Sequence, residues 1–190
     1  ASVNAQGRYE KAAGFNGNIT SMITTFDGGF AICGTSDSDS GNVVVARYNS
    51  IGSRLWMKEI GSITAEYAHD ITQTSDGGYF IGGYSNSPIS GDKSEPTFGA
   101  DLEYYDYWVI KLKQNGDFYW ENTIGGNKHE VCYNGIELAD GTLVIGGYST
   151  SNISGDKTEP RFGGPDIPDI WIVALETAGD IIWQSVIGGI

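Results

Sequence analysis

The chain lacks the long apolar runs, the excess of cations and the helical spacing that mark several large classes of protein. Its longest strongly apolar stretches are about five residues, whereas a helix needs about 20 to cross a bilayer. Lys and Arg number 11 against 24 Asp and Glu, a formal net charge of −13. Nucleic-acid surfaces need clustered cations, so we expect no nucleic-acid partner, and the charge equally disfavours anionic lipid. No segment repeats apolar residues at helical spacing between capping residues, so we do not expect a helical fold.

Histidine and cysteine are scarce as well. His69 and His129 are the only histidines, and Cys33 and Cys132 are the only cysteines. No serine or cysteine stands in the local context of an activated nucleophile, so we expect that the protein is not an enzyme. We expect the two cysteines to be small buried residues in strands, with a disulfide or a metal pair as the alternative.

What the chain does have is one sequence unit written three times. The tryptophans that close the copies, Trp56, Trp120 and Trp183, lie 64 and 63 residues apart. In each copy an Asp-Gly turn leads into one apolar stretch, and a second apolar stretch follows. These stretches cover residues 27–34 and 43–48, 76–85 and 107–112, and 140–149 and 170–175. A fixed period of this length indicates supersecondary units that bury their faces against neighbouring units.

Each unit has the pattern of four short strands. Asp76-Gly77 and Asp140-Gly141 predict tight turns because glycine accepts positive φ, and the chain contains 28 glycines. Residues 107–112 are almost continuously apolar, which is typical of a strand covered on both faces. The Gly-Gly pair inside 79–85 indicates a closely approaching backbone, which sheets crowded around an axis would supply. Small residues on an inner strand and aromatics outside are typical of the blades of a β-propeller.

The sequence therefore predicts an all-β fold of β-propeller blades in an incomplete ring. Three four-stranded antiparallel blades span residues 15–61, 62–126 and 127–190, and residues 1–14 are the outer strand of a preceding blade. We expect the first strand of the second blade to begin at His69.

The repeat also resembles a known family. Its run from Trp and Ile-Gly-Gly through Asp-Gly-Gly-Tyr, Ile-Gly-Gly-Tyr-Ser and Ser-Gly-Asp-Lys to Tyr-Trp-Val-Ile-Lys-Leu is similar to the bacterial β-propeller repeats of the SBBP type. Those repeats recur in large secreted and cell-surface proteins, notably of the Bacteroidetes. The resemblance covers nearly the whole chain, but the first copy lacks the Ser-Gly-Asp-Lys loop and the tryptophan of the third strand. It implies an extracellular, non-enzymatic structural or adhesive module, and it transfers no catalytic residues.

Three blades leave two sheet faces open, whereas propellers typically close with four to eight blades. If each face is on the order of 500 Å², leaving it exposed forfeits roughly 10 kcal/mol at about 25 cal/mol per Å². We therefore expect a protein partner on these faces. It is either the remaining blades of a longer protein or an identical subunit that closes a six-bladed dimer. Residues 7–14 match a closing strand with Tyr9 in the tryptophan position, which favours the longer protein.

Two long polar loops, residues 86–106 and 152–169, hold all five prolines and the carboxylates that are candidates for binding calcium. The candidate metal ligands are Asp92, Glu95, Asp156 and Glu159. Carboxylates with nearby carbonyls are the oxygen ligands that Ca²⁺ takes. The spacing of a dedicated calcium loop is missing, however, and Lys93 and Lys157 offset part of the charge. We therefore expect solvated structural loops without a cofactor, with calcium as the alternative.

The same loops carry four candidate ligand-binding aromatics, Phe98, Tyr104, Tyr105 and Phe162. Loops on a rigid scaffold are where binding usually resides, so these rings are candidates to stack on a glycan or to contact a protein. Alternatively, they pack the loops onto the edges of the blades. A lectin-like propeller is thus the second function that the sequence supports, beside a structural or adhesive module.

Overall fold

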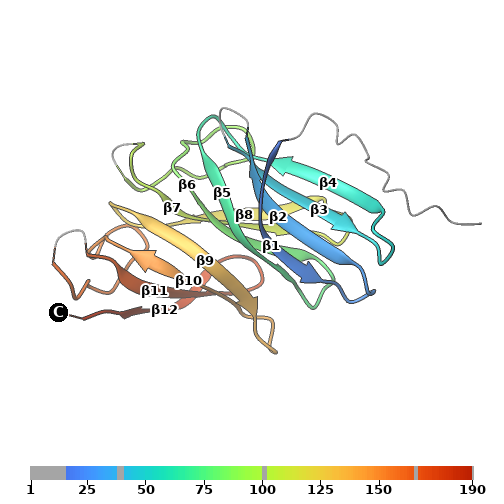
Figure 1. Cartoon of the computed structure of the whole chain (residues 1–190). Helices are drawn as coiled ribbons and strands as arrows, with labels where there is room; N and C mark the ends of the chain where they lie inside the picture. Colours follow the sequence, from blue (N-terminus) through green and yellow to red (C-terminus); the bar gives the residue numbers. More distant parts are fainter. Residues whose placement is uncertain (1–15, 38–40, 100–101, 165–166, 190) are drawn as a thin grey trace, which may run out of the picture.

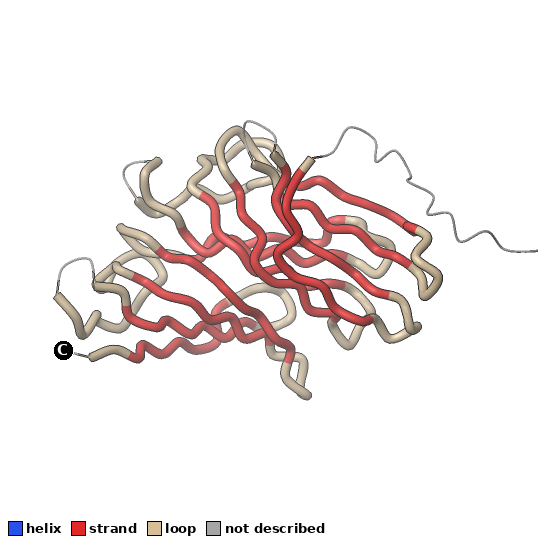
Figure 2. Tube along the Cα trace, viewed as in Figure 1, coloured by secondary structure: helices blue, strands red, loops and turns tan. Residues whose placement is uncertain are grey.

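The computed structural model describes residues 16–37, 41–99, 102–164 and 167–189. These residues form an all-β protein of twelve strands in three four-stranded antiparallel sheets, with no helix among them (Figure 2). The first sheet contains β1 (Gly17–Thr24), β2 (Phe30–Ser36), β3 (Val43–Tyr48) and β4 (Arg54–Ile60). The second contains β5 (Glu66–Gln73), β6 (Tyr79–Ser85), β7 (Asp106–Leu112) and β8 (Phe118–Ile124). The third contains β9 (Glu130–Glu137), β10 (Leu143–Ser149), β11 (Asp169–Leu175) and β12 (Ile181–Ile187).

The strands of each sheet follow one another in chain order, and each sheet lies within the range of one repeat unit. The strand expected within residues 1–14 lies outside the described residues. The Asp-Gly turns form as the sequence predicts. Gly28, Gly77 and Gly141 have φ of 83°, 80° and 90°, the left-handed region that glycine enters without a steric penalty.

The apolar core forms two layers, one on each side of the second sheet. Strand β7 is buried along its whole length, as the sequence predicts. Trp108 and Ile110 pack against the first sheet, while Tyr107 and Val109 pack against the third. This alternation is the period of two that a strand imposes on its side chains. The second sheet is therefore sandwiched between its two neighbours.

The first strands of the three sheets lie next to one another along the middle of the molecule (Figure 1). Asp70 on β5 joins all three sheets. Its Oδ1 accepts a hydrogen bond from Ser21 Oγ on β1 at 2.9 Å, and its Oδ2 accepts one from Gly135 N on β9 at 3.1 Å. Thr72 Oγ1 also donates to the carbonyl of Gly135 at 2.6 Å. The three sheets are thus linked along one common line of first strands.

Two details of these strands differ from expectation. Strand β5 begins at Glu66, earlier than the predicted His69, because a bulge between Ala68 and Asp70 interrupts the alternation that marks a strand. The glycine pair faces this bulge, and a Cβ on Gly83 would lie 1.9 Å from the carbonyl oxygen of Tyr67. The closely approaching backbone is therefore the neighbouring strand of the same sheet, and not another sheet.

Candidate functional site

In the second and third sheets, a short loop between the second and third strands reaches back to the end of the preceding sheet. We call these segments, residues 90–95 and 154–159, the clasp loops. Asp92 N donates to the Gly61 carbonyl at 2.9 Å, and Gly61 N donates to Asp92 Oδ2 at 3.0 Å. Asp156 makes the same two bonds with Gly125, at 2.8 and 3.2 Å. Each clasp loop therefore fastens its own sheet to the preceding one.

The lysine of each clasp loop is buried, whereas the other residues of both loops are exposed or half-buried, in keeping with the expectation of solvated loops. Lys93 is 1% exposed, and its Nζ donates to Thr123 Oγ1 at 2.6 Å and to the carbonyl of Glu95. Lys157 is also 1% exposed, and its Nζ donates to the carbonyl of Glu159 at 2.8 Å. Burial lowers the pKa of both ammonium groups. A buried ammonium persists only with such partners, so these lysines hold the clasp loops in shape.

The carboxylates that are candidate calcium ligands all accept hydrogen bonds from the backbone. The two aspartates accept from the glycines at the end of the preceding sheet. The two glutamates, Glu95 and Glu159, accept from the N–H groups of Thr123 and Val186, both at 2.8 Å. Among the described residues, no three His, Cys, Asp or Glu side chains are grouped as a metal site. Because Lys93 also donates to the carbonyl of Glu95, the loop is better suited to capping backbone groups than to surrounding Ca²⁺ with six to eight oxygens.

The repeated tryptophans also connect one sheet to the next. Trp56 lies on the turn glycine Gly116 of the second sheet, where a Cβ would be 2.8 Å from the indole. Trp120 lies in the same way on Gly179 of the third sheet, where a Cβ would be 3.3 Å from the indole. Trp183 is 45% exposed, because the described chain places no further sheet beside it. Trp56 and Trp120 therefore fill the space between neighbouring sheets at the two junctions.

Two buried carboxyl groups meet at the junction of the second and third sheets. Asp106 begins β7 and Glu130 begins β9, and the Glu130 carboxyl is near enough to raise the pKa of Asp106. Asp106 is 1% exposed and Glu130 is fully buried. Asp106 Oδ2 accepts a hydrogen bond from Phe98 N at 2.7 Å, but among the described residues Oδ1 has no donor.

Two ionised carboxylates cannot hydrogen-bond to each other, since both are acceptors only. Burial raises the pKa of Asp106 to about 8, and the Glu130 carboxylate raises it further toward that value. The geometry therefore favours one proton shared between the two groups. In the first sheet the position of Asp106 is held by Asn42, which lies with the Glu66 carboxylate against Gly61. Sequence analysis missed the pair, although acidic residues recur at both positions of the repeat.

Aromatic rings of the second and third sheets gather into one cluster. Its members are Tyr67, His69, Tyr84, Tyr104, Tyr105, His129, Tyr133 and Tyr148. The Tyr105 ring stacks on His129 with centroids 5.7 Å apart, and the Tyr104 ring meets His129 edge-on at 5.0 Å. Burial raises the pKa of Tyr84 to about 12 and lowers the pKa of His69, so both are uncharged at neutral pH.

The four predicted ligand-binding aromatics thus separate into two sets. Tyr104 and Tyr105 lie together in this cluster, whereas Phe98 packs on the clasp loop of the third sheet. A Cβ on Gly155 would be 2.8 Å from the Phe98 ring. Phe162 occupies the matching position in the third sheet and is 53% exposed. Neither histidine was predicted to join the tyrosines, because the two occupy different places in the repeat and only the folded sheets bring them together.

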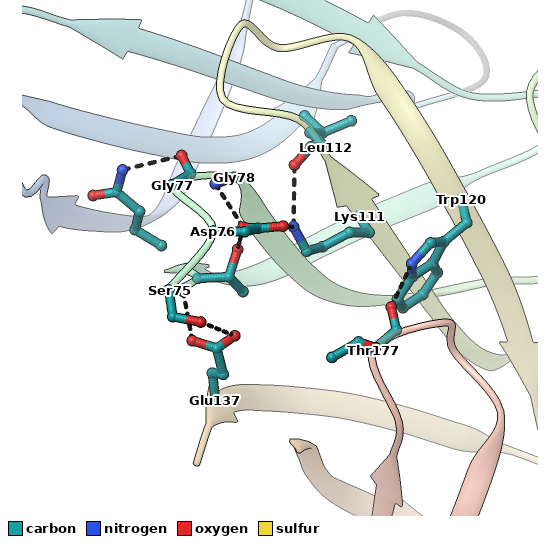
Figure 3. A network of polar contacts seen from close by, with 11 residues as sticks. Ser75, Asp76, Gly77, Gly78, Lys111, Leu112, Trp120, Glu137 and Thr177 are labelled. Carbon is teal, nitrogen blue, oxygen red and sulfur yellow. Dashed lines mark hydrogen bonds and ion pairs between the residues drawn. The ribbon is translucent and has the colours of Figure 1, made fainter. Parts of the chain in front are cut away.

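Both junctions between sheets contain a cavity lined by described residues. The cavity between the first and second sheets measures about 180 Å³, and the one between the second and third about 290 Å³. In the larger one Lys111 Nζ donates to both carboxylate oxygens of Asp76, at 2.8 and 3.1 Å, while Ser75 N donates to Glu137 at 2.6 Å (Figure 3). Arg47 and Asp27 form the equivalent ion pair in the smaller cavity. Because each buried cation is already paired with the aspartate of a turn, the cavities belong to the packing of the sheets.

No family model and no curated protein matches this chain. Among solved structures, a single-residue variant of the Synechocystis apocarotenoid oxygenase aligns with 14% identity and a TM-score of 0.48. The alignment covers 90% of this chain and 38% of the oxygenase chain. In the described part of the chain, no helix is long and apolar enough to cross a membrane.

Proposed function

We propose that the three sheets are successive blades of a β-propeller that acts as a non-enzymatic structural or adhesive module, extracellular or on the cell surface. One observation carries this proposal: the junction between sheets is built twice from matching residues. Trp56 and Gly116 at the first junction correspond to Trp120 and Gly179 at the second. Sheets that meet repeatedly through equivalent faces, along a common line of first strands, are the arrangement of propeller blades.

The extracellular assignment is supported by the resemblance to secreted and cell-surface repeats. The non-enzymatic assignment is supported by what the reactive side chains do. Burial raises the pKa of both Cys33 and Cys132 to about 12, which suppresses the thiolate that a nucleophile needs. Both thiols are free and buried, as expected for small core residues. The clasp-loop carboxylates are likewise engaged by backbone donors.

The partner in this proposal is protein, bound to an apolar sheet face. The third sheet offers such a face, with Ile170 and Ile187 exposed by 52% and 54%. An interaction module keeps such a face available, and exposed apolar patches commonly mark protein-binding surfaces.

Dye binding together with thermal unfolding tests the proposal. Replacing Ile170 and Ile187 together by Ser should lower the binding of anilinonaphthalene sulfonate and leave the melting temperature almost unchanged. Val109→Ser, at a covered position, should lower stability by about 2–4 kcal/mol, the usual range for emptying a buried apolar site. Equal destabilisation by the two changes would mean that the third sheet already packs against something within the chain, and the proposal would be wrong.

The aromatic cluster favours carbohydrate binding as a second function. Tyr104 and Tyr105 place their rings beside His129, and aromatic rings can stack against the apolar face of a sugar. A glycan array is the direct test. Reproducible binding to one sugar that is lost in Tyr104→Ala and Tyr105→Ala, and kept in the control Tyr119→Ala, would favour the lectin-like function. An empty array would leave the structural module as the better account.

A further inference from the structure

The outer face of the third sheet repeats, position by position, the face that the second sheet buries. Ile170 takes the place of Tyr107, and Ile187 takes the place of Ile124. Tyr107 and Ile124 are fully buried against the third sheet, whereas their counterparts are more than half exposed. The same holds for glycine: a Cβ on Gly82 would lie 3.1 Å from Cys132 Sγ, whereas nothing lies within 4 Å of one on Gly146. Among the residues that the structure describes, the third sheet therefore carries a junction face with no neighbouring sheet on it.

A buried aspartate at the edge of this face is the second feature that matches the junction between the second and third sheets. Asp169 is 3% exposed, and its Oδ2 accepts a hydrogen bond from Phe162 N at 2.7 Å. Asp106 is held in the same way by Phe98 N, also at 2.7 Å, and its carboxyl meets Glu130 of the following sheet. Asp169 thus corresponds to Asp106, and the residue that would correspond to Glu130 would come from a following sheet at this edge.

The end of the third sheet also repeats the backbone site that a clasp loop fastens. Gly125 stands against the Asp106 carboxyl and pairs with Asp156, while Gly188 stands in the same way against the Asp169 carboxyl. Among the described residues, no clasp loop reaches Gly188. An apolar face, a buried aspartate and a closing glycine thus recur together at one edge.

We propose that this face binds a further four-stranded sheet of the second or third repeat type. Such a sheet would bring a glutamate at the start of its first strand and a Ser-Gly-Asp-Lys clasp loop. The inference rests on the proposed function, because it takes the sheets to be stacking blades. It goes beyond that function by naming which kind of blade the face selects.

The first sheet of a second copy does not meet these requirements. The position held by Glu66 and Glu130 is Gly17 in the first sheet, so it has no carboxyl to offer Asp169. The first copy of the repeat also lacks the clasp-loop sequence. The first sheet does have the turn glycine, Gly52, that Trp183 could cover, so the tryptophan contact does not distinguish one type of repeat from another. The glutamate and the clasp loop are the features that distinguish them. A head-to-tail dimer would therefore leave both of these requirements unmet.

Two extended chains test the selection. One is the full chain followed by a copy of residues 62–126, and the other is the full chain followed by a copy of residues 16–61. Hydroxyl-radical footprinting read by mass spectrometry reports the exposure of Trp183, and Trp120 in the same chain is the internal standard for a covered tryptophan. Modification of Trp183 should fall to the level of Trp120 in the first extension and stay at the level of the unextended chain in the second. Adding E66G to the appended copy of the first extension should restore part of the modification.

The outcomes separate the two proposals. Equal protection in both extensions would overturn the selectivity and leave the blade assignment standing. No protection in either one, with circular dichroism showing that the appended strands have formed, would overturn the blade assignment as well. Sedimentation velocity of the unextended chain addresses the second copy: a stable dimer with protected Trp183 would contradict the inference, and an exposed Trp183 would support it.

Discussion

The Trp120 indole donates its Nε1 hydrogen to the carbonyl of Thr177 at 3.0 Å, and so joins the fourth strand of one sheet to a turn of the next (Figure 3). The same ring covers Gly179, whose φ of 101° lies in the left-handed region. Trp56 covers Gly116 at the preceding junction. The fourth strands of the first two sheets therefore contact a turn of the following sheet, whereas the described residues place no such turn beside Trp183.

Replacing Gly83 by Ala should destabilise the protein severely, by more than about 3 kcal/mol. A Cβ there would lie 1.9 Å from a backbone oxygen, which is far inside contact distance. Gly146→Ala, at the first glycine of the corresponding pair, is the control, because it adds the same methyl group where nothing lies within 4 Å. Urea unfolding of the two variants checks the prediction, and equal effects would show that the bulge does not govern the glycine pair.

The Asp106–Glu130 pair predicts a pH dependence of stability. The pKa of Asp106 is about 8 in the folded protein, above its ordinary value of 3.8, so the folded state binds the additional proton. Its stabilising contribution is complete below pH 3.8 and is lost as the pH rises to about 8. The free energy of unfolding should fall by at most about 1.4 kcal/mol per pH unit within this window from this group alone.

Asp106→Asn should remove this dependence, because an amide donates to Glu130 without a proton that can dissociate. The difference in melting temperature between the wild type and Asp106→Asn should therefore shift steadily against the wild type between pH 4 and pH 8. Asn42→Asp offers the reverse test, since it creates a second carboxyl pair beside Glu66 and should add a pH dependence of the same sign. A difference that does not vary with pH would show that the pair shares no proton.

Calcium addition or chelation should leave the melting temperature unchanged. The oxygens of Asp92 and Asp156 already accept backbone hydrogen bonds, and a lysine ammonium donates to a carbonyl in each clasp loop. Differential scanning fluorimetry with calcium and with a chelator measures this directly. A rise in melting temperature that Asp156→Asn abolishes would instead establish the calcium site.

The sequence predicted the sheets well because their signals are local. Asp76-Gly77 makes a tight turn whatever lies around it, and residues 107–112 read as a covered strand from their apolar run alone. The repeat then carried these assignments from one copy to the next. The start of β5 was predicted too late in the chain because the bulge at His69 interrupts the alternation of apolar and polar residues that marks a strand. Glu66 is also charged, and charged residues are more typical of loops than of buried strand positions.

The contacts between sheets were harder to predict. The burial of Lys93 was not predicted, because an ammonium is rarely buried and only the folded loop supplies the oxygens that make its burial acceptable. The meeting of Asp106 with Glu130, and of Tyr105 with His129, depends on how one sheet lies on the next. The two members of each pair occupy different positions of the repeat, so comparing the copies in sequence does not predict that they meet.

The most direct test of the account compares two matched tryptophans. Trp120→Ala should lower the free energy of unfolding in urea by about 3 kcal/mol, because it empties a filled junction between sheets. Trp183→Ala, at the same position of the next repeat, should lower it by less than about 1 kcal/mol, because that ring covers no turn in the part of the chain that the structure describes. Losses of equal size would contradict the claim that the closing tryptophans join successive sheets and that the outer face of the third sheet is open.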